Sequence, residues 1–230
     1  MPWGNGIMIA DKKSYQISLF VVVNILINCI GKIVAKELQL PLWLDSFGTV
    51  YTAYLLGPVC GAIVGASVNI IYAVLFSYTH MIYAIVSVIL GITVGVCAKK
   101  GYLTSLFGTL SVSFLVTMIS VLISTPLNYL FFEGNTGNIW GDGVISLLQR
   151  IGCNEIVSHC IGEFYIDFLD KTLTITVLSL TVRLYRRYGK ELLKRKKPWA
   201  LLAVIGILTL FSGMEVKAEN AADGETVNFN

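Results

Sequence analysis

Charged residues are scarce in this sequence. Asp, Glu, Lys and Arg make up 13% of the 230 residues, whereas soluble domains carry about 25%. Hydrophobic residues make up 55%, and the mean hydropathy is +0.73. So little charge excludes an ordinary soluble globular domain. We therefore expect an all-α integral membrane protein, because helices satisfy their own backbone hydrogen bonds inside lipid.

The sequence also lacks the patterns of most catalytic sites. No Gly-rich loop ends in Gly-Lys-Ser or Gly-Lys-Thr, so nothing predicts that the chain hydrolyses nucleotides by itself. With only His80 and His159, no Ser/His/Asp arrangement is apparent, and no carboxylates have metal-ligand spacing. Cys153 and Cys160 would lie roughly 10 Å apart on a helix, beyond disulfide reach. We expect neither an enzyme nor a bound metal or cofactor.

Long hydrophobic runs dominate instead, and they predict six membrane-spanning helices. Uninterrupted, the second and third runs would form one helix roughly 50 Å long, too long for a bilayer. Gly57 as a left-handed C-terminal cap and Pro58 at a first helical position predict a hairpin turn between them. Residues 127–170 are predicted to form a turn and short helices. The six spans are 15–35, 42–56, 59–77, 81–98, 102–126 and 171–185.

Basic and acidic residues lie on opposite sides of this arrangement. Lys12-Lys13, Lys99-Lys100 and the basic residues of 183–197 fall on one side. The segment 127–170, on the other side, is acidic apart from Arg150. The positive-inside rule therefore predicts a multi-pass protein of the plasma membrane with a cytoplasmic N-terminus.

The C-terminal part has a separate pattern. Residues 191–218 contain a basic linker, an apolar core at 199–211 and the small-residue site Val216-Lys217-Ala218. This pattern fits a secretory signal and, equally, a seventh short membrane helix. We expect three parts: a six-span membrane domain (1–190), this signal-like or transmembrane segment (191–218), and a polar extracytoplasmic tail (219–230).

Polar side chains inside membrane helices are costly and are therefore candidate functional residues. In the predicted topology they converge in the outward halves of the helices, which is typical of a small-molecule pocket rather than a pore. The predicted substrate-binding residues are Trp43, Asp45, Gly48, Thr49, Asn69, Tyr72, Tyr83, Asn128, Asp170 and Lys171.

Simpler explanations exist for several of them. Asp45 could cap the second span, and Trp43 could be an interfacial belt residue. Asn69 could form a hydrogen bond between helices. Asp170 and Lys171 could form an internal ion pair or contact a ligand.

These residues belong to recognisable stretches: "LPLWLDSFGTVYTAYLLGPVCGAIVGASVN", "YAIVSVILGITVG", "STPLNYLFFEGNTGNIWGD" and "DKTLTITVLSL". Over roughly residues 15–188 the chain resembles the substrate-binding S components of energy-coupling factor (ECF) transporters. The resemblance implies a bacterial six-helix protein that captures a vitamin-like micronutrient. It also implies a T component and two ATPase subunits as partners, and ligand contacts at Asp45, Gly48, Thr49, Asn69, Asn128, Asp170 and Lys171.

Two functions of different class follow. The first is high-affinity capture and uptake of a small micronutrient, powered by partner ATPases. The second is a ligand-sensing or anchoring membrane module fused to an exported C-terminal domain, for which the signal-like segment is the sequence evidence.

Overall fold

The computed structural model describes the backbone of residues 14–194 and the side chains of 17–184. Lys12-Lys13, the predicted apolar core at 199–211 and the polar tail lie outside the described residues. The described part up to Ser179 forms one compact unit, and the part from Leu180 belongs to a second. The pocket discussed below lies entirely within the first unit.

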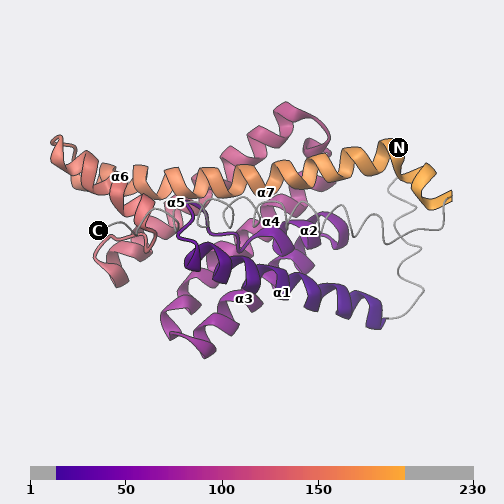
Figure 1. Ribbon diagram of the computed structural model, residues 1–230, viewed down its shortest axis with the longest axis horizontal. Coiled ribbons are helices and arrows are strands. Elements are labelled where there is room, and N and C mark those ends of the chain that lie inside the picture. Colours follow the sequence, from indigo (N-terminus) through magenta and orange to yellow (C-terminus); the bar gives the residue numbers. More distant parts are fainter. Residues whose placement is uncertain (1–13, 195–230) are drawn as a thin grey trace, which may run out of the picture. The chain divides into compact units, whose positions relative to one another are not determined.

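Residues 14–194 are mostly helical and include no strand, which confirms the predicted all-α class (Figure 1). The α-helices are α1 (Ser14–Glu37), α2 (Phe47–Leu56), α3 (Pro58–Leu75), α4 (Ala84–Lys99), α5 (Leu106–Phe132), α6 (Ile139–Arg150) and α7 (Glu155–Lys194). Two 3₁₀ turns, η2 (Tyr78–Tyr83) and η3 (Tyr102–Thr104), precede α4 and α5.

Within the described residues, four helical segments are long and apolar enough to cross a membrane: Ile17–Glu37, Pro58–Leu75, Tyr78–Lys99 and Leu106–Phe132. They correspond to the first, third, fourth and fifth predicted spans. The second predicted span, 42–56, is wrong in extent, because α2 has only ten residues. At 1.5 Å per residue it is roughly 15 Å long, half the thickness of a hydrocarbon core.

The turn at Gly57 and Pro58 is confirmed, although the predicted cap geometry is wrong. Gly57 has φ 97° and ψ 175°, which lies outside the left-handed helical region, and Pro58 is at the start of α3 as expected. A Cβ atom at Gly61 would lie 2.5 Å from that of Ala53, and one at Gly65 would lie 2.7 Å from the Ser87 carbonyl oxygen. Glycine at these positions therefore allows α2 and α4 to pack closely against α3.

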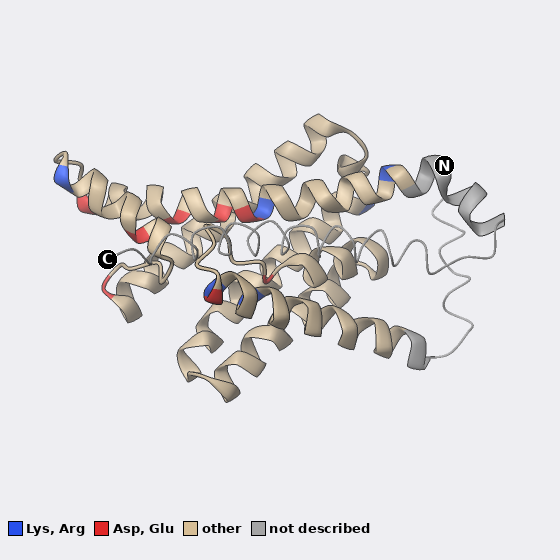
Figure 2. Ribbon diagram, in the orientation of Figure 1, with Lys and Arg blue, Asp and Glu red and all other residues tan. Residues whose placement is uncertain are grey.

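The predicted boundary at Lys171 is also wrong, because α7 begins at Glu155 and runs through Asp170 and Lys171 without a break. Hydropathy favoured an interruption where acidic residues accumulate. In the structure these residues lie along one helix, and they account for much of the charge shown in Figure 2.

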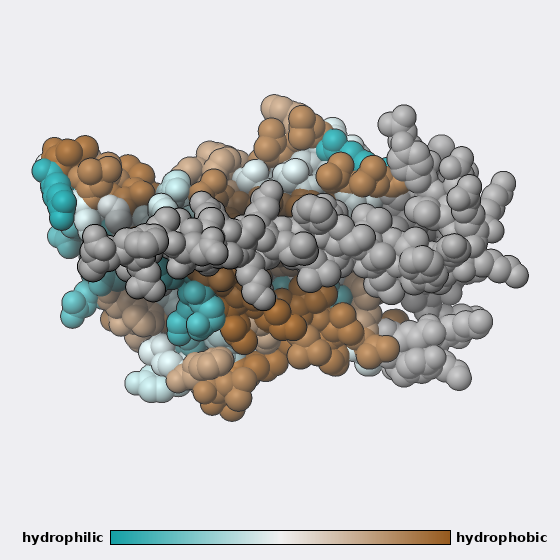
Figure 3. Space-filling model, in the orientation of Figure 1, coloured by the Kyte–Doolittle hydropathy of each residue, from teal (hydrophilic) through white to brown (hydrophobic). Residues whose placement is uncertain are grey.

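Many large apolar residues are exposed on the outside of the bundle, and its interior contains polar as well as apolar residues. Asn28 and Thr49 are fully or almost fully buried, as is Val64, whereas Val74 and Phe107 are each at least three-quarters exposed. Figure 3 shows apolar surface over much of one face. So much exposed apolar surface is unusual for a soluble protein and is expected for helices surrounded by lipid.

Candidate functional site

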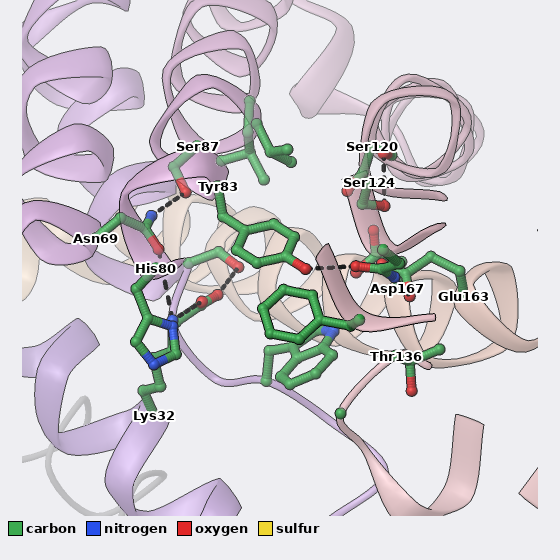
Figure 4. Close-up of a pocket in the computed structure, with 18 of the residues that line it drawn as sticks. Lys32, Asn69, His80, Tyr83, Ser87, Ser120, Ser124, Thr136, Glu163 and Asp167 are labelled. Carbon is green, nitrogen blue, oxygen red and sulfur yellow. Dashed lines mark hydrogen bonds and ion pairs between the residues drawn. The ribbon is translucent and has the colours of Figure 1, made fainter. Parts of the chain in front are cut away.

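A cavity of about 440 Å³ lies among α1, α2, α3, η2, α4, α5 and α7. Its volume falls within the range of small-molecule sites. Figure 4 shows Lys32, Asn69 and His80 on one side, Glu163 and Asp167 on the other, and the Tyr83 ring between them. Two loops also contribute to the lining: residues 43–46 before α2, and residues 133–137 after α5.

Seven of the ten predicted binding residues line this cavity: Trp43, Asp45, Thr49, Asn69, Tyr83, Asn128 and Lys171. The other three, Gly48, Tyr72 and Asp170, do not line the cavity and instead form hydrogen bonds that hold the segments around it. The Gly48 amide donates to Asn28 Oδ1 at 2.6 Å, and the Tyr72 hydroxyl donates to the Cys29 carbonyl oxygen at 3.0 Å. Asp170 holds the 43–46 loop.

Lys32 and Asp45 form an ion pair at one end of the cavity. Lys32 Nζ is 3.5 Å from Asp45 Oδ2 and also 3.5 Å from Asn69 Oδ1, and it lies 4.7 Å from the centre of the Tyr72 ring. Asn69 Nδ2 in turn donates to Ser87 Oγ at 2.8 Å. Asn69 therefore contacts both α1 and α4, so it forms the interhelical hydrogen bonds that were its simpler explanation while also lining the cavity.

Asp45 is held in its ionised form. Burial by itself would raise its pKa, but Lys32, Lys171 and the Ser46 hydroxyl outweigh burial and place the pKa below its ordinary value. The proposal that Asp45 caps α2 is wrong. Ser46 occupies the N-cap position, and no side chain makes a capping hydrogen bond there.

Asp170 fastens the 43–46 loop to α7. Its Oδ1 atom accepts from the Trp43 and Leu44 amides at 3.2 and 2.8 Å, and its Oδ2 atom accepts from Ser46 Oγ at 3.1 Å. Lys171 Nζ lies 2.8 Å from the same Oδ2 and 3.2 Å from Ser46 Oγ. The internal ion pair predicted for Asp170 and Lys171 is therefore confirmed, and Lys171 also reaches the cavity lining.

A chain of hydrogen bonds forms the opposite end of the cavity. The Tyr83 hydroxyl donates to Asn128 Oδ1, and Asn128 Nδ2 donates to Glu163 Oε2 at 3.0 Å. Asp167, one turn further along α7, has its Oδ1 atom 3.7 Å from Lys171 Nζ. Glu163, Asp167 and Lys171 thus recur at four-residue intervals on one face of α7.

The segment before α2 and the start of α6 contact each other beside the cavity. Trp140 Nε1 donates to the Gln39 carbonyl oxygen at 2.7 Å, and Asn138 Nδ2 donates to that of Leu40 at 2.9 Å. The 133–137 loop is itself held by Asp142, whose Oδ1 atom accepts from the Thr136 amide at 2.7 Å and from its hydroxyl at 2.8 Å. The loops before α2 and before α6 are therefore bound together beside the pocket.

Sequence reasoning missed Lys32, His80, Glu163 and Asp167. Lys32 is a lone lysine inside an apolar span, which is a signal that could have been followed. The four-residue spacing of Glu163, Asp167 and Lys171 is also visible in the sequence. It indicates a shared helix face only if one helix begins before residue 163 and continues past residue 171. In the described part of the chain, no group of three or more His, Cys, Asp or Glu residues could hold a metal ion.

No protein-family model, curated protein or solved structure matches the chain.

Proposed function

We propose that the chain is a substrate-capture subunit, an S component of an ECF-type transporter, which binds a small vitamin-like micronutrient in this cavity. The observation that carries the proposal is the cavity itself. It has molecular size, is surrounded by apolar helices, and has charged and amide side chains at both ends. Such convergence of a few polar groups on an otherwise apolar cavity is the usual composition of a ligand site.

The aromatic side chains that line the cavity favour a ligand that contains a ring. The Tyr83 and Phe132 rings are nearly parallel, with their centres 6.2 Å apart and an interplanar angle of 20°. Trp43 and Phe131 also line the cavity. Flat apolar faces with polar groups at their ends fit a heterocycle that carries polar substituents.

The proposal includes a topology and partners. The six predicted helices lie in the bacterial plasma membrane with the N-terminus in the cytoplasm, although α2 is too short to cross it by itself, and the acidic segment that contains α6 faces outward. Since the sequence has no nucleotide-binding loop, a T component and two ATPase subunits supply the energy for release into the cell.

Native mass spectrometry of the gently solubilised full chain tests the proposal. We expect one small molecule to co-purify and to be lost when Asp45, Asn128 and Lys171 are each replaced by alanine. Glu155→Gln, an exposed change at the start of α7, should retain it. An empty protein that also fails to bind any member of a vitamin panel would refute capture, and would favour the sensor or anchor function.

A further inference from the structure

Two carboxylates on α7 line the cavity, and one of their oxygens has no hydrogen-bond partner among the described residues. We call Glu163 and Asp167 the acidic wall. Asp167 is 3% exposed, and its Oδ2 atom has no hydrogen-bond partner among the described residues, although Ser120 lies beside the carboxylate. Glu163 is 4% exposed and forms no ion pair within the described part of the chain. A buried carboxylate oxygen left unpaired is costly, so its presence beside a cavity points to a missing donor.

Several groups around the acidic wall already use donors within the protein. Tyr83 donates its hydroxyl proton to Asn128, and Asn128 donates an amide proton to Glu163. The Ser124 hydroxyl lies beside Glu163 and donates to the Ser120 carbonyl oxygen at 2.8 Å. Asp167 Oδ2 receives no hydrogen bond from any of these groups.

The charged residues of the lining include more acids than cations. Counting Asp, Glu, Lys and Arg, the lining contains four acids, Asp45, Glu133, Glu163 and Asp167, and two cations, Lys32 and Lys171. Both cations are already paired: Lys32 with Asp45, and Lys171 with Asp170 and Asp167. The lining therefore offers an anionic ligand no cation that is not already paired.

From this geometry we infer that the ligand is a planar nitrogen heterocycle or amidine, cationic or rich in N–H groups, whose donors bind Glu163 and Asp167. The inference rests on the proposed function, because it specifies the substrate class of the same cavity. Two N–H groups on one ring edge would satisfy the acidic wall in a charge-assisted manner, while the ring packs against Tyr83.

A matched pair of probes tests the charge preference. Benzamidinium and benzoate share one ring and differ in charge, and their dissociation constants can be measured by calorimetry on the full chain in detergent. We expect benzamidinium to bind at least about tenfold more tightly. Glu163→Gln and Asp167→Asn should each reduce this ratio by at least about fivefold, whereas Glu155→Gln on the same helix should not change it.

Both variants preserve side-chain shape, and their elution and thermal midpoint establish that they are folded. Equal or tighter binding of benzoate overturns the inference, as does an unchanged ratio in both variants or failure of benzamidinium to bind at about 10 mM. The proposed function is judged separately by the co-purified molecule. An anionic solute retained by the wild-type chain would refute the acidic-wall assignment and leave substrate capture intact.

Discussion

At the scale of single residues, the neighbours of Asp45 determine the charge of its carboxyl group. Asp45 is 19% exposed and faces Lys32, which is 14% exposed, so neither group is fully hydrated. Two nearby cations keep the carboxylate ionised despite burial. Asp45 therefore stabilises the folded protein only while it is charged.

This gives a pH dependence for Asp45. Because its folded pKa lies below the ordinary value of 3.8, its contribution is fully present above that value and is lost as pH falls through the lower folded pKa. We expect Asp45→Asn to lower stability by about 1 kcal/mol near pH 7, and the difference from wild type to shrink as pH falls below 3.8. Thermal midpoints measured in detergent from about pH 7 to about pH 3 test this. A difference that persists undiminished at the lowest pH would contradict it.

At the scale of elements, the 39–46 segment depends on a helix far away in the sequence. It contains two non-glycine residues with positive φ, Gln39 at 51° and Leu44 at 53°. Such conformations are unfavourable and need support from tertiary contacts. Asp170 provides this support by accepting the Trp43 and Leu44 amides.

Asp170→Ala should therefore loosen the loop without unfolding the bundle. We expect amide hydrogen exchange at Trp43 and Leu44 to accelerate by about tenfold or more, with little change in α3. Asp45→Ala is the matched control, because Asp45 makes no hydrogen bond to these amides in the described structure. Equal exchange in wild type and Asp170→Ala would show that another contact holds the loop.

Helices were predicted best from the sequence where a run of apolar residues begins and ends at the same place as the helix. The runs that became α1, α3, α4 and α5 are apolar, and turns or polar residues separate most of them. The run from Leu42 is equally apolar, but its first residues form the loop that places Trp43 and Asp45 at the cavity. The opposite error occurred in α7, where a short helix ending at Asp170 and a separate span from Lys171 were predicted although the helix is continuous. Neither fact is visible without tertiary contacts, since Asp170 lies more than 120 positions from the loop it holds.

At the scale of the whole molecule, the proposed topology places the α6–α7 connection outside and the α4–α5 connection inside. Cys153 lies in the former and Lys100 in the latter. In intact cells, a chain with Cys153 as its single cysteine should react with a membrane-impermeant maleimide. A chain with Lys100→Cys as its single cysteine should react only after lysis. The reverse pattern would invert the topology and place the acidic segment in the cytoplasm.

The hydrogen bonds from Trp140 to Gln39 and from Asn138 to Leu40 have a kinetic consequence. Because these bonds do not involve a solute, they hold the segment before α2 against the start of α6 whether the cavity is full or empty. A solute that contacts both cavity loops would add to the barrier for separating them, so the empty protein would open more often than the loaded one.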